Sequence, residues 1–195
     1  MNTKDNIIEK SFVLFLQRGY KEVSLNEILK NCGVSKGAFY HYYKSKDELF
    51  DDVLNRFFFS YFKKQDVDYS NALFEVKIKY LVKTFIEPYN EVANLLGQKQ
   101  ISAYFRFLFQ SVNSFPNIRH SVNKHFYTKG YYIYQITEQA KQAGELKADI
   151  DSKIIARQLL STITGELVLE GIYDISDIEI KLNNVIDEYI KLLKI

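Results

Sequence analysis

Apolar residues recur along most of the chain with the spacing that places them on one face of an α-helix. In the first such stretch Ile8, Phe12 and Leu16 lie four residues apart, and Gly19 follows as a residue that can take a positive φ and end the helix. The same kind of stripe continues to the final stretch, residues 178–193. This periodicity predicts an all-α protein.

Two short helices separated by a tight turn are predicted near the N-terminus. One begins at a capping box, in which Ser24 and Glu27 can satisfy each other's free backbone N–H groups, and Gly33 ends it. Ser35 can cap the next helix, which runs from Lys36 to about Tyr43. Two short helices joined by a three-residue turn indicate helix-turn-helix geometry.

The rest of the chain is predicted to form further helices in a second domain. Capping boxes at 45–48 and 176–179 predict the starts of a fourth and of a last helix. Breaks are expected near residues 65–70, 88–90, 111–116, 144–151 and 171–176. We therefore expect about nine helices, with a three-helix helix-turn-helix domain at residues 1–50 and a larger helical domain at 51–195.

Composition supports a folded protein without a membrane span or a disulfide framework. The chain has 195 residues, 47% of them hydrophobic, which is enough to bury a core. Its one cysteine excludes an intramolecular disulfide, and one cysteine with three histidines argues against a structural zinc site. No apolar run approaches a membrane span, and the N-terminus does not resemble a signal peptide. We expect a cytoplasmic protein with no metal and no cofactor.

The positive charge of the N-terminal domain is concentrated in one window. Residues 28–46 contain four lysines, one histidine and no acidic residue, with three tyrosines interleaved. A short basic and aromatic segment is typical of a nucleic-acid contact, although an ordinary solvated helix face can carry the same charge.

The helix after the turn carries the candidate DNA contacts. Gly37 and Ala38 are small enough for the helix backbone to approach base edges, and Lys36 can donate to guanine. We expect Lys46 to offer its charge and a backbone N–H to a phosphate. Phe39 and Tyr43 should instead face the core. The full set of candidate DNA contacts is Ser24, Ser35, Lys36, Gly37, Ala38, Tyr40, His41, Tyr42 and Lys46.

Residues 8–49 resemble the N-terminal domain of the tetracycline-repressor-like (TetR) family of bacterial regulators. The resemblance rests on Phe15, Gly19, Tyr20, Ser24, Ile28, Gly33-Val34-Ser35-Lys36-Gly37, Phe39-Tyr40, Tyr43, Ser45-Lys46 and Leu49. Cys32 and Tyr43 depart from the usual Ala and Phe of the family, and both suit a core. The resemblance implies a transcriptional regulator, usually a repressor, that binds a palindromic operator as a homodimer and releases it when a small molecule binds the C-terminal domain.

The middle of the chain holds many aromatic residues, which either pack a core or line a cavity for a hydrophobic or aromatic effector. The resemblance favours a cavity. Glu166 lies on an otherwise apolar helix and could pair with Arg106 or with a cationic ligand, or be a surface acid. The candidate effector residues are Tyr80, Thr84, Tyr104, Phe105, Phe109, Tyr127, Tyr131, Gln135 and Glu166.

Two apolar helices at the C-terminal end of the chain can form a four-helix interface across a two-fold axis. They can equally close the core of a single chain, and the resemblance favours the dimer. The candidate interface residues are Leu159, Ile163, Leu167, Leu182, Val185, Ile186 and Tyr189.

No pattern in the chain indicates an enzyme. The zinc-protease, P-loop and hydrolase motifs are all missing from the sequence, Cys32 belongs to an apolar helix face, and His120 and His125 are expected at the surface. The function expected is therefore a ligand-responsive DNA-binding repressor. The alternative is a DNA-binding adaptor whose C-terminal domain contacts a partner protein.

Overall fold

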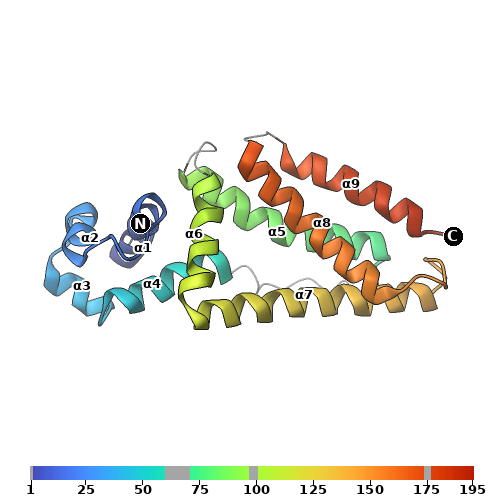
Figure 1. Cartoon of the computed structure of the whole chain (residues 1–195), viewed down its shortest axis with the longest axis horizontal. Coiled ribbons are helices and arrows are strands. Elements are labelled where there is room, and N and C mark those ends of the chain that lie inside the picture. The colour runs from blue at the N-terminus through green and yellow to red at the C-terminus, as the bar shows by residue number, and fades with distance from the viewer. Residues whose placement is uncertain (1, 60–70, 97–100, 174–176) are drawn as a thin grey trace.

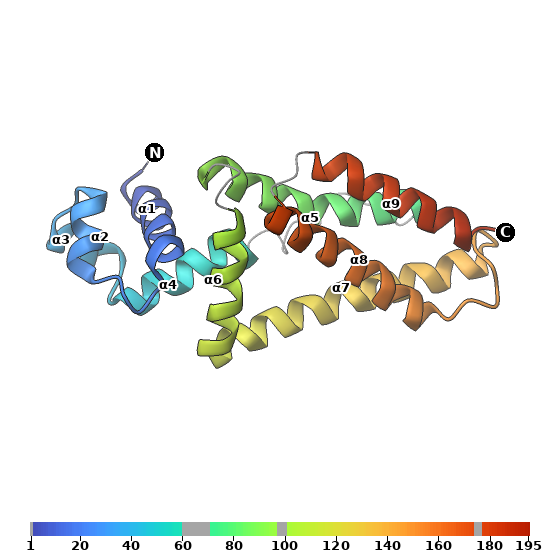
Figure 2. The same cartoon turned by 45° about the horizontal axis from the view of Figure 1, so that its top comes forward.

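The computed structural model describes residues 2–59, 71–96, 101–173 and 177–195, and the all-α prediction is confirmed within them. The helices are α1 (Thr3–Arg18), α2 (Leu25–Cys32), α3 (Lys36–Tyr42), α4 (Lys46–Leu54), α5 (Phe74–Leu96), α6 (Ile101–Ser114), α7 (Pro116–Gln142), α8 (Ser152–Tyr173) and α9 (Ile178–Leu193), with a π-helical turn, η1, at Asn55–Phe59. Helices α1–α4 form one end of an elongated molecule, and α5 and α7–α9 form the other (Figure 1). Helix α6 stands between the two groups (Figure 2).

The ends of the first helices follow the capping pattern of the sequence. Ser24 and Glu27 form the expected reciprocal capping box at the start of α2. At α4, Ser45 accepts a hydrogen bond from the Glu48 N–H, but the Glu48 carboxylate accepts from the Lys44 N–H instead of from Ser45. This second box is therefore only half formed. In the third predicted capping box, at residues 176–179, Ser176 lies outside the described residues.

The helix break predicted at Pro88 is wrong, because α5 continues through it from Phe74 to Leu96. A proline inside a helix removes one backbone hydrogen bond and usually costs about 3 kcal/mol. Here Pro88 is buried together with Phe85, Ile86 and Tyr89 around it. Tertiary packing on both sides of the proline outweighs the local preference to end the helix.

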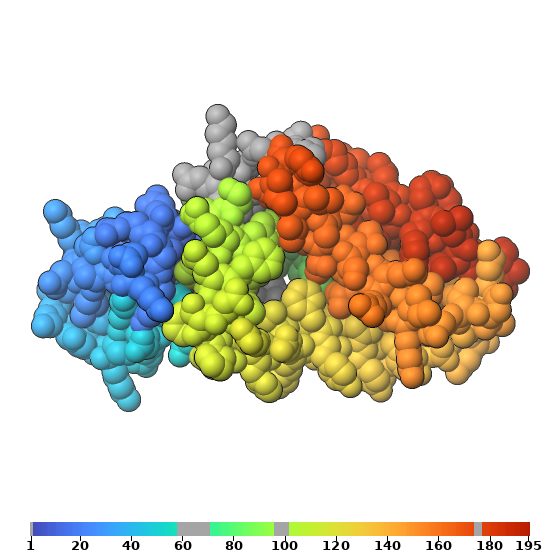
Figure 3. All heavy atoms as spheres, viewed as in Figure 1, coloured from blue at the N-terminus to red at the C-terminus, as the bar shows by residue number. Residues whose placement is uncertain are grey.

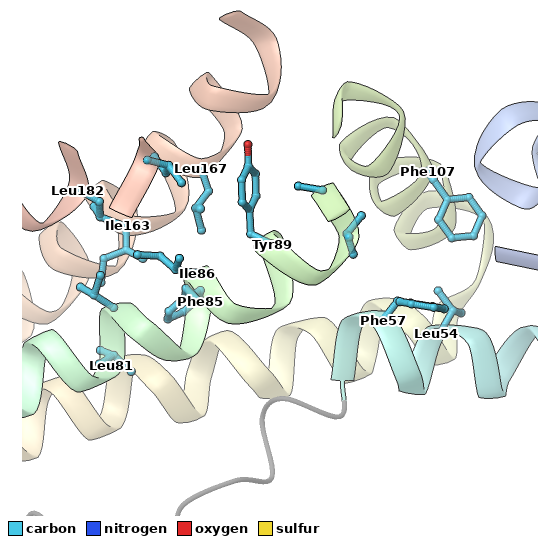
Figure 4. Close-up of a cluster of buried hydrophobic side chains, with 14 of the residues drawn as sticks. Leu54, Phe57, Leu81, Phe85, Ile86, Tyr89, Phe107, Ile163, Leu167 and Leu182 are labelled. Atoms are coloured by element: carbon cyan, nitrogen blue, oxygen red, sulfur yellow. The ribbon is translucent and has the colours of Figure 1, made fainter. Parts of the chain in front are cut away.

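The C-terminal stripes close the core of the single chain. Leu159, Ile163, Leu167, Leu182 and Ile186 are buried in the absence of any partner. Figure 4 shows Ile163, Leu167 and Leu182 beside Ile86 of α5. The assignment of these five residues to a dimer interface is therefore corrected. Val185 remains exposed and Tyr189 is half-buried.

Aromatic rings join α6 to the N-terminal helices. Phe12 of α1 stacks on Phe57 at a centroid distance of 3.9 Å, and the Phe107 ring of α6 meets Phe12 edge-on at 6.3 Å. Figure 4 shows Phe107 facing Phe57. The Arg106 guanidinium also donates to the Leu16 carbonyl at the end of α1 (3.3 Å). Helix α6 is thus in direct contact with the domain that carries the helix-turn-helix.

None of the helices within the described ranges combines the length and the apolar character needed to cross a bilayer.

Candidate nucleic-acid interface and effector cavity

The turn between α2 and α3 has the geometry that the sequence predicts. Gly33 adopts a left-handed conformation (φ 68°, ψ 31°), and Ser35 caps α3 by accepting a hydrogen bond from the Ala38 N–H at 3.1 Å. Phe39 and Tyr43 are buried, as expected for the residues that hold α3 to the core. The position and tilt of α3 are therefore fixed by its inward face.

The outward face of α3 is exposed. Lys36, Gly37 and His41 are open to solvent, and Tyr40 and Tyr42 are 48% and 38% exposed. Ser35 is also exposed, and Ala38 is half-buried. A Cβ atom added at Gly37 would meet only the Ser35 hydroxyl, at 4.0 Å. The fold itself therefore does not require glycine at this position, so the small residue keeps the outer side of α3 clear for a molecule approaching from outside.

The structure gives Lys46 a different position from the expected one. Its ammonium donates to the carbonyls of Tyr20 (3.0 Å) and Val23 (2.8 Å) and lies 4.1 Å from the centroid of the Tyr20 ring. Burial lowers the pKa of this lysine. The charge therefore ties the start of α4 to the loop after α1, which corrects the expectation that it faces a phosphate.

Ser24 is exposed at the first turn of α2, where it takes part in a small polar network. Its backbone N–H and its hydroxyl both donate to the Glu27 carboxylate at 2.8 Å, and Arg18 pairs with the same carboxylate. These bonds lower the pKa of Glu27 to about 2. Ser24 therefore stabilises the start of α2 from within the protein.

A cavity of about 720 Å³ lies between α5, α6, α7 and α8. Figure 3 shows the surface hollowed between α6, α7 and α8, with α5 visible at the bottom. The described lining residues are Phe85, Pro88 and Tyr89 of α5, Tyr104, Phe105, Leu108, Phe109 and Val112 of α6, Val122, His125 and Phe126 of α7, and Ser161, Thr164, Gly165, Leu167, Val168 and Leu169 of α8. This volume and this mostly apolar wall suit a small organic molecule.

Only part of the candidate effector set lies on this wall. Tyr104, Phe105 and Phe109, all from α6, line the cavity. The other six candidates, Tyr80, Thr84, Tyr127, Tyr131, Gln135 and Glu166, do not. Tyr127, Tyr131 and Gln135 face solvent, because the inward face of α7 is the one that carries Ile133 and Ile136.

Two polar expectations around the cavity also need correction. Arg106 does not pair with Glu166, since its guanidinium donates to Leu16. His125, expected at the surface, lines the cavity, and burial together with the nearby Lys129 charge lowers its pKa to about 3. The sequence pointed to neither His125 nor Lys129, although both lie on one face of α7, four residues apart.

Comparison with known proteins agrees with the helix-turn-helix geometry. Residues 7–53 match the model of the bacterial regulatory proteins of the tetR family. These residues form a DNA-binding domain of the TetR family. The match runs from within α1 to α4, the segment that carries the helix-turn-helix.

Relatives and solved structures extend the similarity. The chain is 48% identical over 52 residues to the uncharacterized regulator YuxN of Bacillus subtilis, a match that covers 27% of this chain and 18% of YuxN. It is 23% identical over 171 residues to the regulator UidR of Escherichia coli, covering 85% of this chain and 80% of UidR. A crystal structure of a putative transcriptional regulator from Saccharomonospora viridis in complex with choline has a TM-score of 0.72 at 18% identity, covering 96% of this chain and 95% of that one. This last likeness shows that the two proteins share one fold over almost the whole of both chains.

Proposed function

We propose that this regulator is a ligand-responsive repressor that binds a palindromic operator as a homodimer. The exposed outer face of α3, from Lys36 to Tyr42, enters the major groove. This placement is supported by the exposure of Lys36, Gly37 and Tyr40 to solvent, on a helix that the buried Phe39 anchors to the core. Half-sites about 34–36 Å apart, or a multiple of that spacing, match two such helices in a dimer. Residues 1–50 act as the DNA-binding domain and 51–195 as the effector and dimerisation domain.

The cavity is the effector site, and α6 carries the signal. One side of α6 lines the cavity through Tyr104, Phe105 and Phe109. The same helix contacts α1 through Phe107 and Arg106. It also contacts η1, because the Tyr104 hydroxyl lies 3.5 Å from the Phe57 carbonyl. A molecule that displaces α6 therefore displaces the DNA-binding domain. For a full switch, the effector must prefer the non-binding state by on the order of 5 kcal/mol. The presence of the cavity favours this switch over an adaptor that contacts a partner protein.

The dimer uses the apolar residues that the single chain leaves exposed at its C-terminal end. On α8 these are Ile154, Leu169, Ile172 and Tyr173, and on α9 they are Ile180, Val185 and Leu192. Exposed apolar side chains on two adjacent helices support a four-helix interface between two copies.

Two variants test the DNA contact and the cavity in gel shifts on the DNA upstream of the protein's own gene, with and without a panel of hydrophobic compounds. Tyr40→Ala should weaken DNA binding without lowering thermal stability, because the ring is half exposed. Gly165→Phe should retain DNA binding but resist release, because a side chain added there enters open space at the cavity wall.

Each variant has a result that contradicts its part of the proposal. A large loss of thermal stability in Tyr40→Ala would show that the ring is part of the core. Unchanged release by the same compounds in Gly165→Phe would place the effector outside this cavity.

A further inference from the structure

A buried cation lies beside the effector cavity. Lys129 of α7 is 9% exposed, and its ammonium donates to the Thr84 hydroxyl at 3.1 Å. The same nitrogen lies 5.7 Å from the centroid of the Phe85 ring. Phe85 lines the cavity, and so does His125, which lies one turn before Lys129 on α7. A positive charge therefore stands directly behind one end of an apolar cavity.

No acidic group of the described chain neutralises this charge. Thr84 is a neutral partner, and none of the ion pairs formed among the described residues includes Lys129. Burial lowers the pKa of Lys129 to about 8, with no carboxylate acting to raise it, so the amine is still mostly protonated at neutral pH. An unpaired buried charge is costly, and a neutral side chain would meet the packing role alone.

The residues of the cavity wall determine which ligand charge is accepted at the end of the cavity beside Lys129. Its described lining residues include no acidic side chain, and their polar groups are hydroxyls and the neutral His125 imidazole. A cationic ligand would find no counter-charge there and would meet the Lys129 ammonium. An anionic group at the same end would be attracted by that ammonium and could accept a hydrogen bond from the imidazole.

We propose that the effector is an amphipathic organic acid whose carboxylate sits at the Phe85–His125 end of the cavity, facing Lys129. Its hydrocarbon or aromatic body fills the apolar remainder between α6 and α8. This inference rests on the proposed function, because it names the ligand class of the same cavity. Lys129 then sets specificity, and the hydrophobic surface supplies most of the binding.

Calorimetric binding of matched probes to the full-length protein tests the charge preference. Two body shapes are used, 4-phenylbutyl and decyl, each as the carboxylic acid, the primary amide and the amine. The acid should bind about tenfold more tightly than the amide of the same body, and the amine most weakly.

Variants of Lys129 then show whether this lysine is the cause. Lys129→Met should bring the acid-to-amide ratio close to one while leaving amide binding intact. Lys129→Gln, which can keep a hydrogen bond to Thr84, provides the same measurement if the Met variant does not fold. Lys124→Met removes an exposed charge from the same helix and should leave the ratio unchanged.

The outcomes separate this inference from the proposed function. If amides or amines bind as tightly as the acids, or if the ratio survives in both Lys129 variants, the acid preference is overturned and the cavity stands as the effector site. If no probe of either shape binds at millimolar concentration, the effector cavity itself is overturned, and the inference with it.

Discussion

Replacement of Lys46 by methionine separates a structural lysine from a DNA-binding one. The ammonium makes two hydrogen bonds to backbone carbonyls and lies over an aromatic ring. A hydrogen bond from a charged donor contributes roughly 1.5–3 kcal/mol, but Lys46 is only half-buried, so water can replace part of it. We expect Lys46→Met to lower the free energy of unfolding by about 2 kcal/mol. For a chain of this size, that loss lowers the Tm by roughly 4–8 °C.

The assay pairs this variant with Lys36→Met in thermal unfolding and in salt-dependent DNA binding. Lys36 is exposed at the start of α3, so its removal should leave the Tm unchanged. If Lys36 contacts the DNA backbone, a plot of the logarithm of the DNA association constant against the logarithm of the salt concentration should become less steep, by about one. Lys46→Met should show the opposite pattern, with a lower Tm and an unchanged slope when binding is measured well below its Tm.

The reasoning about Lys46 would be refuted by a wild-type Tm combined with a slope lowered by about one. That result would mean that the ammonium leaves the Tyr20 and Val23 carbonyls and binds a phosphate instead.

The remaining predictions concern the C-terminal domain. Leu182→Glu should unfold the chain, because it buries a charge in the core, whereas Ile172→Glu on the exposed face of α8 should give a folded monomer in sizing chromatography. A folded Leu182→Glu protein, or a persistent dimer of Ile172→Glu, would contradict this division. The stability of the wild type should rise relative to Lys129→Met as the pH is raised from 8 to about 10. The reason is that the folded pKa of about 8 lies below the unfolded value, so the unfolded chain binds more protons in this window. A difference in Tm between wild type and Lys129→Met that stays constant over this range would show that the pKa of Lys129 is not lowered in the folded protein.

The DNA-binding helices could be predicted from the sequence because their determinants are local. A capping box spans four residues, and the turn needs one residue with positive φ and one cap. Ser24, Gly33 and Ser35 supply these signals within about ten positions, and the structure confirms all three. Even the burial of Phe39 and Tyr43 follows from the period of one short helix.

The cavity between α5, α6, α7 and α8 could be predicted only in outline, because its wall comes from four helices. The spacing of apolar residues predicts amphipathic helices in the middle of the chain. The rotation of each helix about its axis, however, depends on which of its side chains pack against the neighbouring helices. Tyr127 and Tyr131 therefore turned outward, while His125 and Lys129 of the same helix turned inward. Pro88 shows the same dependence, since packing kept α5 helical where the local signal predicted a break.

By itself, the sequence determined an all-helical chain, a helix-turn-helix unit and its resemblance to the TetR family, since these depend on spacing over a few residues. Only the tertiary structure decided that the stripe through Ile163 and Leu182 closes the chain's own core and that the Lys46 charge is held by backbone carbonyls. It also decided that the Lys129 ammonium, which has no acidic partner among the described residues, is buried beside the cavity. These outcomes depend on contacts between residues far apart in the chain, where several arrangements satisfy the same local pattern and the best-packed one prevails.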